Sequence, residues 1–212
     1  MNSLAPPRTE HDLPLLTRTP PHWAQAVLAD PIALLNDHAF LEKKAANNAL
    51  ELLTKWPEPG VPGWVQAMTD VARDEAAHLS QVNRLLTRRG GRLQRMHKNP
   101  YANALRQLVR KGAGASEVVD RLLISALIES RSCERFAVLA EAARDAELAA
   151  FYQRLYSSEL GHYLVFLKLA KAVEKPERVD RRWQELLEHE AQILAAQEPG
   201  PRIHSGVPEE IA

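Results

Sequence analysis

The sequence has very little cysteine and no excess of charge of either sign. Its 212 residues include one cysteine, Cys133, so an intrachain disulfide is impossible and a thiolate metal cluster is excluded. Any bound metal must therefore use nitrogen and oxygen ligands. The 27 basic side chains balance the 27 acidic ones, so net charge alone indicates no partner.

Long hydrophobic runs are also absent. The opening residues lack the continuous apolar stretch of a signal peptide. No later stretch approaches the roughly 20 uninterrupted apolar residues that a membrane span needs. We therefore expect a cytoplasmic protein with no stable membrane association.

Helix-forming composition dominates what is present. Segments rich in Ala, Leu, Glu and Arg are separated by Pro and Gly, and no alternating strand pattern occurs. The sequence thus predicts an all-α fold with a four-helix bundle, additional short helices and a fifth long C-terminal helix. The length suits one domain. We place that domain at residues 21–198, between a Pro-rich N-terminal tail at 1–20 and a C-terminal tail at 199–212.

Proline, glycine and capping residues predict the helix boundaries. Pro31 suits the first turn of a long helix, Asn99 suits the N-cap of a short one, and Ser116 suits the N-cap of the third long helix. The predicted helices are a short one at 22–29, long ones at 31–56, 64–89 and 116–143, a further one ending near 173, and others at 98–112 and 175–194.

Two Glu-x-x-His sequences stand out. Glu75 precedes His78 by three residues, and Glu159 precedes His162 by three. Each pair lies on the apolar stripe of its helix, where an ionised carboxylate is costly unless it is paired or binds a cation. One such pair arises easily by chance in Glu-rich helices, whereas two on inward faces favour a metal site.

The two remaining long helices each offer one glutamate on an inward stripe, Glu42 and Glu129. Glu42 lies 33 residues before Glu75, and Glu129 lies 30 residues before Glu159, which is the spacing expected of a duplicated helix pair. Ferritin-like di-iron and di-manganese bundles hold their metals with this set of residues. The predicted ligands are Glu42, Glu75, His78, Glu129, Glu159 and His162.

Two neighbouring residues compete with this assignment. Glu134 follows Glu129 on the same helix, and we interpret it as a partner of Arg131 or Arg135, with a role beside the ligands left open. His38 lies one turn before Glu42 and could approach the metals, but a hydrogen-bonded core histidine is the favoured interpretation.

The ligand types indicate the chemistry. Four carboxylates and two neutral imidazoles carry a formal charge near minus four, which suits two iron or manganese ions better than soft metals. Six protein ligands for two ions leave positions open for dioxygen. We therefore expect O2 chemistry in which the protein positions a substrate and excludes water.

One segment is strongly basic although the whole chain is neutral. Residues 76–116 contain no Asp or Glu. A solvated surface balanced by acids from other helices is one interpretation, and a phosphate-binding patch is the other. The segment holds nine cations: Arg84, Arg88, Arg89, Arg92, Arg95, Lys98, Arg106, Arg110 and Lys111.

The stretches FLEKKAANNALELL, ARDEAAHL, LIESRSCERFAVLA and LYSSELGHYLVFLKLA resemble the tRNA 2-methylthio-N6-isopentenyladenosine hydroxylases of the MiaE family. The resemblance covers nearly all of the chain between the tails. It implies a non-haem di-iron monooxygenase that uses O2 and an external electron donor, with the six predicted ligands holding two iron ions. The implied partner is a tRNA anticodon stem-loop carrying the modified adenosine, contacted by Arg88, Arg89, Arg92, Arg95 and Lys98.

The sequence also leaves two other classes of function open. A ferritin-like or rubrerythrin-like protein that handles iron or peroxide would have little use for the basic segment. A di-iron quinone-biosynthesis hydroxylase would need an amphipathic membrane-binding surface, for which the stretch YANALRQLVRKG is a candidate.

Overall fold

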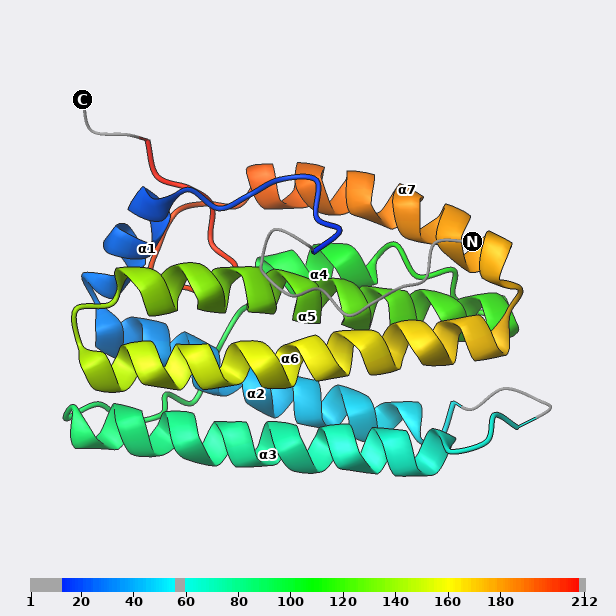
Figure 1. Cartoon of the computed structure of the whole chain (residues 1–212), viewed down its shortest axis with the longest axis horizontal. Coiled ribbons are helices and arrows are strands. Elements are labelled where there is room, and N and C mark those ends of the chain that lie inside the picture. The colour runs from blue at the N-terminus through cyan, green and yellow to red at the C-terminus, as the bar shows by residue number, and fades with distance from the viewer. Residues whose placement is uncertain (1–12, 56–59, 210–212) are drawn as a thin grey trace.

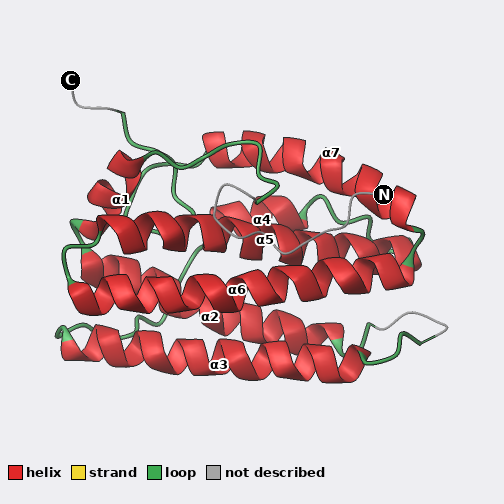
Figure 2. Ribbon diagram, viewed as in Figure 1, coloured by secondary structure: helices red, strands yellow, loops and turns green. Residues whose placement is uncertain are grey.

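The computed structural model describes residues 13–55 and 60–209, and in these ranges the protein is built from helices and loops without strands (Figure 2). The all-α prediction is confirmed. The described helices are α1 (Pro21–Leu28), α2 (Pro31–Leu52), α3 (Trp64–Arg88), α4 (Pro100–Arg106), α5 (Ala115–Ala142), α6 (Ala146–Val173) and α7 (Pro176–Ala195).

Four long helices form the bundle. α2 packs along α3, and α5 packs along α6, so each consecutive pair is a helical hairpin (Figure 1). α7 lies beside α5 on the side away from α3, and α4 packs against both α5 and α7. The four ligand-bearing helices therefore face one another along the middle of the bundle.

Among the described helices, α2, α4 and α6 begin with a side-chain cap. The Asp30 carboxylate accepts a hydrogen bond from the Ala33 amide, and Pro31 occupies the first turn. Asn99 caps α4 as predicted, by accepting a hydrogen bond from the amide of Ala102. Ser116 does not cap α5. That helix begins earlier, at Ala115, because Gly114 takes the N-cap position with a positive φ of 56°.

The apolar core is divided into two clusters along the bundle. One contains Trp64, Met68 and other residues from the start of α3, together with the ends of α2 and α6. The second contains the opposite halves of these helices, including Val82 and Phe151. The predicted ligands lie between the clusters in sequence on α2, α3 and α6, so a polar centre at mid-bundle has apolar packing on both sides.

Segments assigned to the tails pack onto the helices where the structure describes them. Leu13 and Leu15 are buried, and Thr19 donates a hydrogen bond to Glu134 of α5. At the other end, Ile203 and Ser205 are fully buried. The sequence did not indicate this packing, because neither segment has a helical period.

The helix α4 buries its apolar face within the protein. Tyr101, Ala102 and Leu105 all lie in the interior, against α5 and α7. The stretch that could have served as a membrane-binding helix is thus used for internal packing. Among the helices that the structure describes, none combines the length and the apolar character needed to cross a membrane.

Candidate metal centre and its cavity

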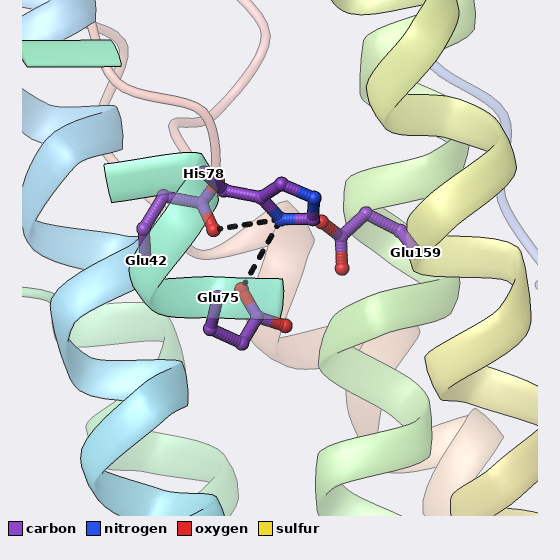
Figure 3. A group of neighbouring side chains, drawn as sticks. All are labelled: Glu42, Glu75, His78 and Glu159. Carbon is purple, nitrogen blue, oxygen red and sulfur yellow. Dashed lines mark ion pairs between the residues drawn. The ribbon is translucent and has the colours of Figure 1, made fainter. Parts of the chain in front are cut away.

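The six residues predicted as metal ligands all lie in the interior of the bundle. Glu42 comes from α2, Glu75 and His78 from α3, Glu129 from α5, and Glu159 and His162 from α6. All six side chains are buried. Four of them each offer one ligand atom to a group whose atoms lie within 4.8 Å of one another. These four, drawn in Figure 3, are Glu42, Glu75, His78 and Glu159.

The two Glu-x-x-His pairs face each other with near symmetry. His78 Nδ1 lies 3.6 Å from Glu75 of its own helix and 3.1 Å from Glu159 of the opposite helix. His162 Nδ1 lies 3.2 Å from Glu159 of its own helix and 2.8 Å from Glu75 across the bundle. Glu75 and Glu159 therefore both lie between the two imidazoles.

Glu42 and Glu129 flank this central arrangement. Glu42 Oε2 lies 3.6 Å from His78 Nδ1. Glu129 lies against Glu159, and its pKa is raised by burial and then by the charges of Glu159 and Glu75. Glu129 and His162 are outside the four-residue group, although His162 contacts two of its members.

The pKa shifts in the cluster show that its buried carboxylates require positive charge beside them. Burial, followed by the charges of Glu159 and Glu42, raises the pKa of Glu75 to about 8. Burial opposes a charge on His162, but Glu159 and Glu75 outweigh it and raise the pKa of that imidazole to about 11. Burial would likewise raise the pKa of Glu159, yet its contacts with His162 and His78 hold it below its usual range. In the protein alone, protonated imidazoles supply the positive charge that the carboxylates require.

The donor set fits metal ions by a second observation. Both carboxylate oxygens of Glu75, Glu159 Oε1 and His78 Nδ1 are buried and make no hydrogen bond of normal geometry. Buried polar atoms without such partners are uncommon and costly. Carboxylate and imidazole atoms gathered in this way suit iron or manganese.

His38 contacts the cluster from α2. Its Nε2 lies 2.5 Å from Glu42 Oε1. Burial lowers the pKa of His38 to about 4, so the ring is neutral and its Nε2–H donates to the carboxylate. The favoured interpretation of a hydrogen-bonded core histidine agrees with this geometry, and the bond also orients a predicted ligand.

Glu134 points away from the cluster. Its carboxylate accepts hydrogen bonds from the Thr19 hydroxyl at 2.7 Å and from Arg131 at 3.0 Å. Glu134 is therefore a partner of Arg131, which was one of the two partners predicted for it. It also holds the segment before α1 against α5. Glu129 remains the residue of α5 that faces the ligands.

A cavity of about 320 Å³ leads from the cluster to the surface. Its walls come mainly from α2, α4 and α5, with contributions from α3, α6 and the C-terminal segment. Glu42, Glu75, Glu129 and Glu159 line it beside apolar side chains, which include Leu41, Ala45, Ile124, Ile128 and Phe136. Its other lining residues include the amides Asn48, Asn103 and Gln107 and the cations Lys44, Arg106, Lys111 and Arg121.

The predicted tRNA-binding cations fall into two groups. Arg88 pairs with Glu147, and Arg89 pairs with Asp145 and Glu147, all at the start of α6. These two cations are therefore balanced by acids distant in sequence. The other predicted cations, Arg92, Arg95 and Lys98, are exposed in the connection between α3 and α4.

That connection lies beside the cavity. His97 Nε2 contacts Asp37 at 2.6 Å, and Lys44 Nζ lies 2.9 Å from His97 Nδ1. Lys44 itself lines the cavity, as does Asn99 at the start of α4. The exposed part of the basic connection thus runs along α2 towards the cavity wall.

Sequence reasoning missed several cavity residues. His204 and Ser132 lie in the cavity wall, with His204 Nε2 3.3 Å from Ser132 Oγ. Asn48 donates a hydrogen bond to Ser125 at 2.9 Å and joins α2 to α5. Polar residues on an inward stripe could have indicated Ser125 and Ser132, but no pattern in the C-terminal segment pointed to His204.

Comparisons with known proteins agree with this architecture. Residues 8–205 match the sequence model of the family described as tRNA-(MS[2]IO[6]A)-hydroxylase (MiaE). The tRNA 2-(methylsulfanyl)-N(6)-isopentenyladenosine(37) hydroxylase of Pseudomonas putida is 39% identical over 194 residues, 92% of this chain and 93% of that protein. The enzyme of the same name from Salmonella typhimurium is 29% identical over 220 aligned positions, 82% of this chain and 80% of that protein.

A solved structure is similar over nearly the whole fold. It is described as protein 43 with aldehyde deformylating oxygenase activity, from Synechococcus. It superposes with a TM-score of 0.84 at 31% sequence identity, covering 93% of this chain and 98% of that one. The likeness supports the predicted ferritin-like bundle.

Proposed function

The chain belongs to the MiaE family of tRNA hydroxylases, and from this membership we propose that it hydroxylates the isopentenyl side chain of 2-methylthio-N6-isopentenyladenosine beside the tRNA anticodon. The observation that carries the proposal is the cavity that joins the carboxylate and imidazole cluster to a surface with basic side chains. The net reaction converts one C–H bond to C–OH, reduces the second oxygen atom of O2 to water, and consumes two electrons and two protons.

The metals of this proposal are two iron ions held by Glu42, Glu75, His78, Glu129, Glu159 and His162. Two observations support Glu75 and Glu159 as ligands that would hold these ions: each lies between the two imidazoles, and each carries a buried oxygen without a hydrogen bond. When bound, the iron ions supply the activation of O2, with electrons from an external donor.

The chain's own residues bind and orient the substrate. A cavity of about 320 Å³ is within the range of small-molecule sites, and its apolar walls suit an isopentenyl group. Leu41, Ile128 and Phe136 offer apolar contacts and exclude water from the hydroxylated carbon. Asn103 and Gln107 on the outer wall offer amide groups to the polar edges of the adenine base.

The RNA itself would contact the surface around the cavity. Single-stranded loops present bases that can be splayed out of the stack, so the modified adenosine can enter while neighbouring phosphates stay outside. Arg92, Arg95 and Lys98 on the exposed connection suit those phosphates. At the cavity wall, Arg106 and Lys111 extend the same basic surface. Arg88 and Arg89 contribute less to this surface, because their charges are paired with α6.

The test is anaerobic loading with ferrous iron, followed by O2, a reductant and tRNA that carries the isopentenyl modification. Mass spectrometry of the digested nucleosides should show a gain of one oxygen on that adenosine, dependent on iron. Two bound irons with O2 consumed but no change in the nucleoside would contradict the proposal and favour quinone or peroxide chemistry. The same tRNA lacking the isopentenyl group is the matched control substrate.

A further inference from the structure

Exposed apolar side chains lie among the cations of the basic connection between α3 and α4. Met96 is 80% exposed, the highest value among the large hydrophobic residues that the structure describes as exposed, and Leu93 is 39% exposed. The same connection carries the exposed cations Arg92, Arg95 and Lys98. Apolar surface and positive charge therefore alternate along one short segment.

The cations of this segment are not balanced by nearby acids. Arg92, Arg95 and Lys98 make no ion pair with another described residue, whereas Arg88 and Arg89 are paired with the start of α6. The chain itself has no Asp or Glu between positions 76 and 116. The surface is therefore complementary in charge to a polyanion, and RNA is a polyanion whose bases also offer flat apolar faces.

The connection is held against α2 at two points, three residues apart. The amide of Gln94 donates to the side chain of Asn36 at 2.9 Å. His97 Nε2 donates to Asp37 at 2.6 Å, and the His97 ring stacks on Phe40 with a centroid separation of 4.9 Å. The two residues between these points are both exposed, so the anchored backbone presents them to solvent.

These contacts place Met96 beside the cavity. Lys44 Nζ donates to Nδ1 of the adjacent His97 at 2.9 Å, and Lys44 lines the cavity. Asn99, three residues after Met96, lines the cavity as well and caps α4. Figure 1 shows the connection leaving the end of α3 and crossing α2 to reach α4. An RNA loop with one base in the cavity therefore has its adjoining nucleotides next to this segment.

We propose that Met96, together with Leu93, packs against a base that adjoins the modified adenosine and so keeps the adenosine out of the base stack. This contact rests on the proposed function and deepens it, because it supplies the element that replaces the lost stacking. When a base leaves the stack, its neighbour exposes an apolar face, and proteins that unstack bases fill the space with apolar side chains, Met and Leu among them. The cations on either side hold the adjoining phosphates.

The first test is the affinity of iron-loaded protein for a modified anticodon stem-loop, measured without O2 over a range of salt concentrations. Met96→Ala should weaken binding roughly tenfold at every salt concentration, because the lost contact is apolar. The dependence on salt should stay the same. Arg95→Gln, at the neighbouring position, should instead reduce the salt slope by about one.

Two further variants identify the kind of contact. Met96→Phe should bind at least as tightly as the unsubstituted protein, because an aromatic ring stacks on a base. Leu50→Ala, which removes an apolar side chain that is 49% exposed on α2, is the matched control and should leave binding unchanged. Since Met96 is exposed, none of its substitutions should alter the melting temperature or the iron content.

A fluorescent base reports the stacking directly. 2-Aminopurine is placed in turn at the two nucleotides that flank the modified adenosine, where its fluorescence rises on unstacking. Saturating unsubstituted protein should raise the signal at one of the two positions, and Met96→Ala should give a smaller rise there. Met96→Phe should quench the signal at that position alone, because its ring stacks on the analogue.

Two outcomes would exclude Met96 as a base contact. One is equal affinity of Met96→Ala and the unsubstituted protein for the stem-loop, with equal 2-aminopurine signals. The other is a loss of binding to anionic phospholipid vesicles in Met96→Ala with unchanged stem-loop affinity, which would describe a membrane surface. Neither binding measurement needs turnover, so failure of the unsubstituted protein to hydroxylate the adenosine would be a separate result that counts against the proposed function.

Discussion

We expect that Glu75, one of the predicted metal ligands, destabilises the metal-free protein. Glu75 is 1% exposed, and neither of its oxygens makes a normal hydrogen bond. Glu75→Gln keeps the shape of the side chain and removes its ionisation. We expect this variant to be more stable than the unsubstituted protein without metal, and to lose metal binding.

The magnitude follows from the pKa of Glu75, which rises from 4.5 to about 8 on folding. For a carboxylate whose folded pKa is raised, stability is complete below the unfolded pKa and is lost as the pH rises towards the folded one. At pH 7 the loss is about 3 kcal/mol. This is an upper limit for the gain in Glu75→Gln, because the substitution also removes the contact with protonated His162. It corresponds to roughly 6–12 °C in melting temperature for a protein of this size.

The assay is calorimetric unfolding of the metal-free proteins at pH 5 and pH 7, with metal content measured after anaerobic iron loading. The advantage of Glu75→Gln should be larger at pH 7 than at pH 5. Iron should raise the melting temperature of the unsubstituted protein only. Glu188→Gln, at an exposed position of α7, is the control for the substitution itself. A Glu75→Gln variant that is less stable at pH 7 without metal, or that still binds two irons, would refute the reasoning.

Three other variants test the surface and the supports of the cavity. Arg92→Glu combined with Arg95→Glu should weaken tRNA binding and reduce its salt dependence while leaving iron content unchanged, and an unchanged salt slope in a binding titration would remove both residues from the interface. Gly206→Ala should raise KM for the stem-loop and lower the melting temperature by a few degrees, because the added methyl group meets a backbone oxygen at 1.8 Å; unaltered kinetics and melting would contradict this. Glu190→Ala should lower the free energy of unfolding by about 3–5 kcal/mol in a denaturant titration, because the fully buried Arg131 loses its bidentate partner. A loss below about 1 kcal/mol would show that the Arg131–Glu190 pair contributes little to stability.

The buried carboxylates of the cluster lower the stability of the metal-free protein, so stability alone does not explain why these residues are present. A core of apolar residues at these positions would avoid the cost of burying Glu75. The two apolar clusters on either side supply the packing that tolerates a polar centre. Functional sites commonly carry such local costs, which the rest of the fold offsets.

The sequence by itself determined the helices and which residues share an inward face. Glu75 and His78 lie three residues apart, so any helix through them places both on one side, and the same holds for Glu159 and His162. Helix period and helix-forming composition are local properties, and for that reason the all-α class and most helix limits could be predicted. The prediction that Ser116 caps α5 was wrong, because Gly114 and Ser116 both suit a helix start and local preference does not decide between them.

Only the tertiary structure decided how these faces and the distant segments meet. Arg89 is balanced by Asp145, 56 positions away in the chain, so its charge could not be assigned to a free surface from sequence. His204 reaches the cavity through a bond between Ile203 and Asp37 that spans 166 positions. Such contacts depend on packing between helices and loops that are distant in the chain, so no regular spacing in the sequence indicates them. The Glu-x-x-His pairs, in contrast, have the three-residue spacing that places two side chains on one face of a helix.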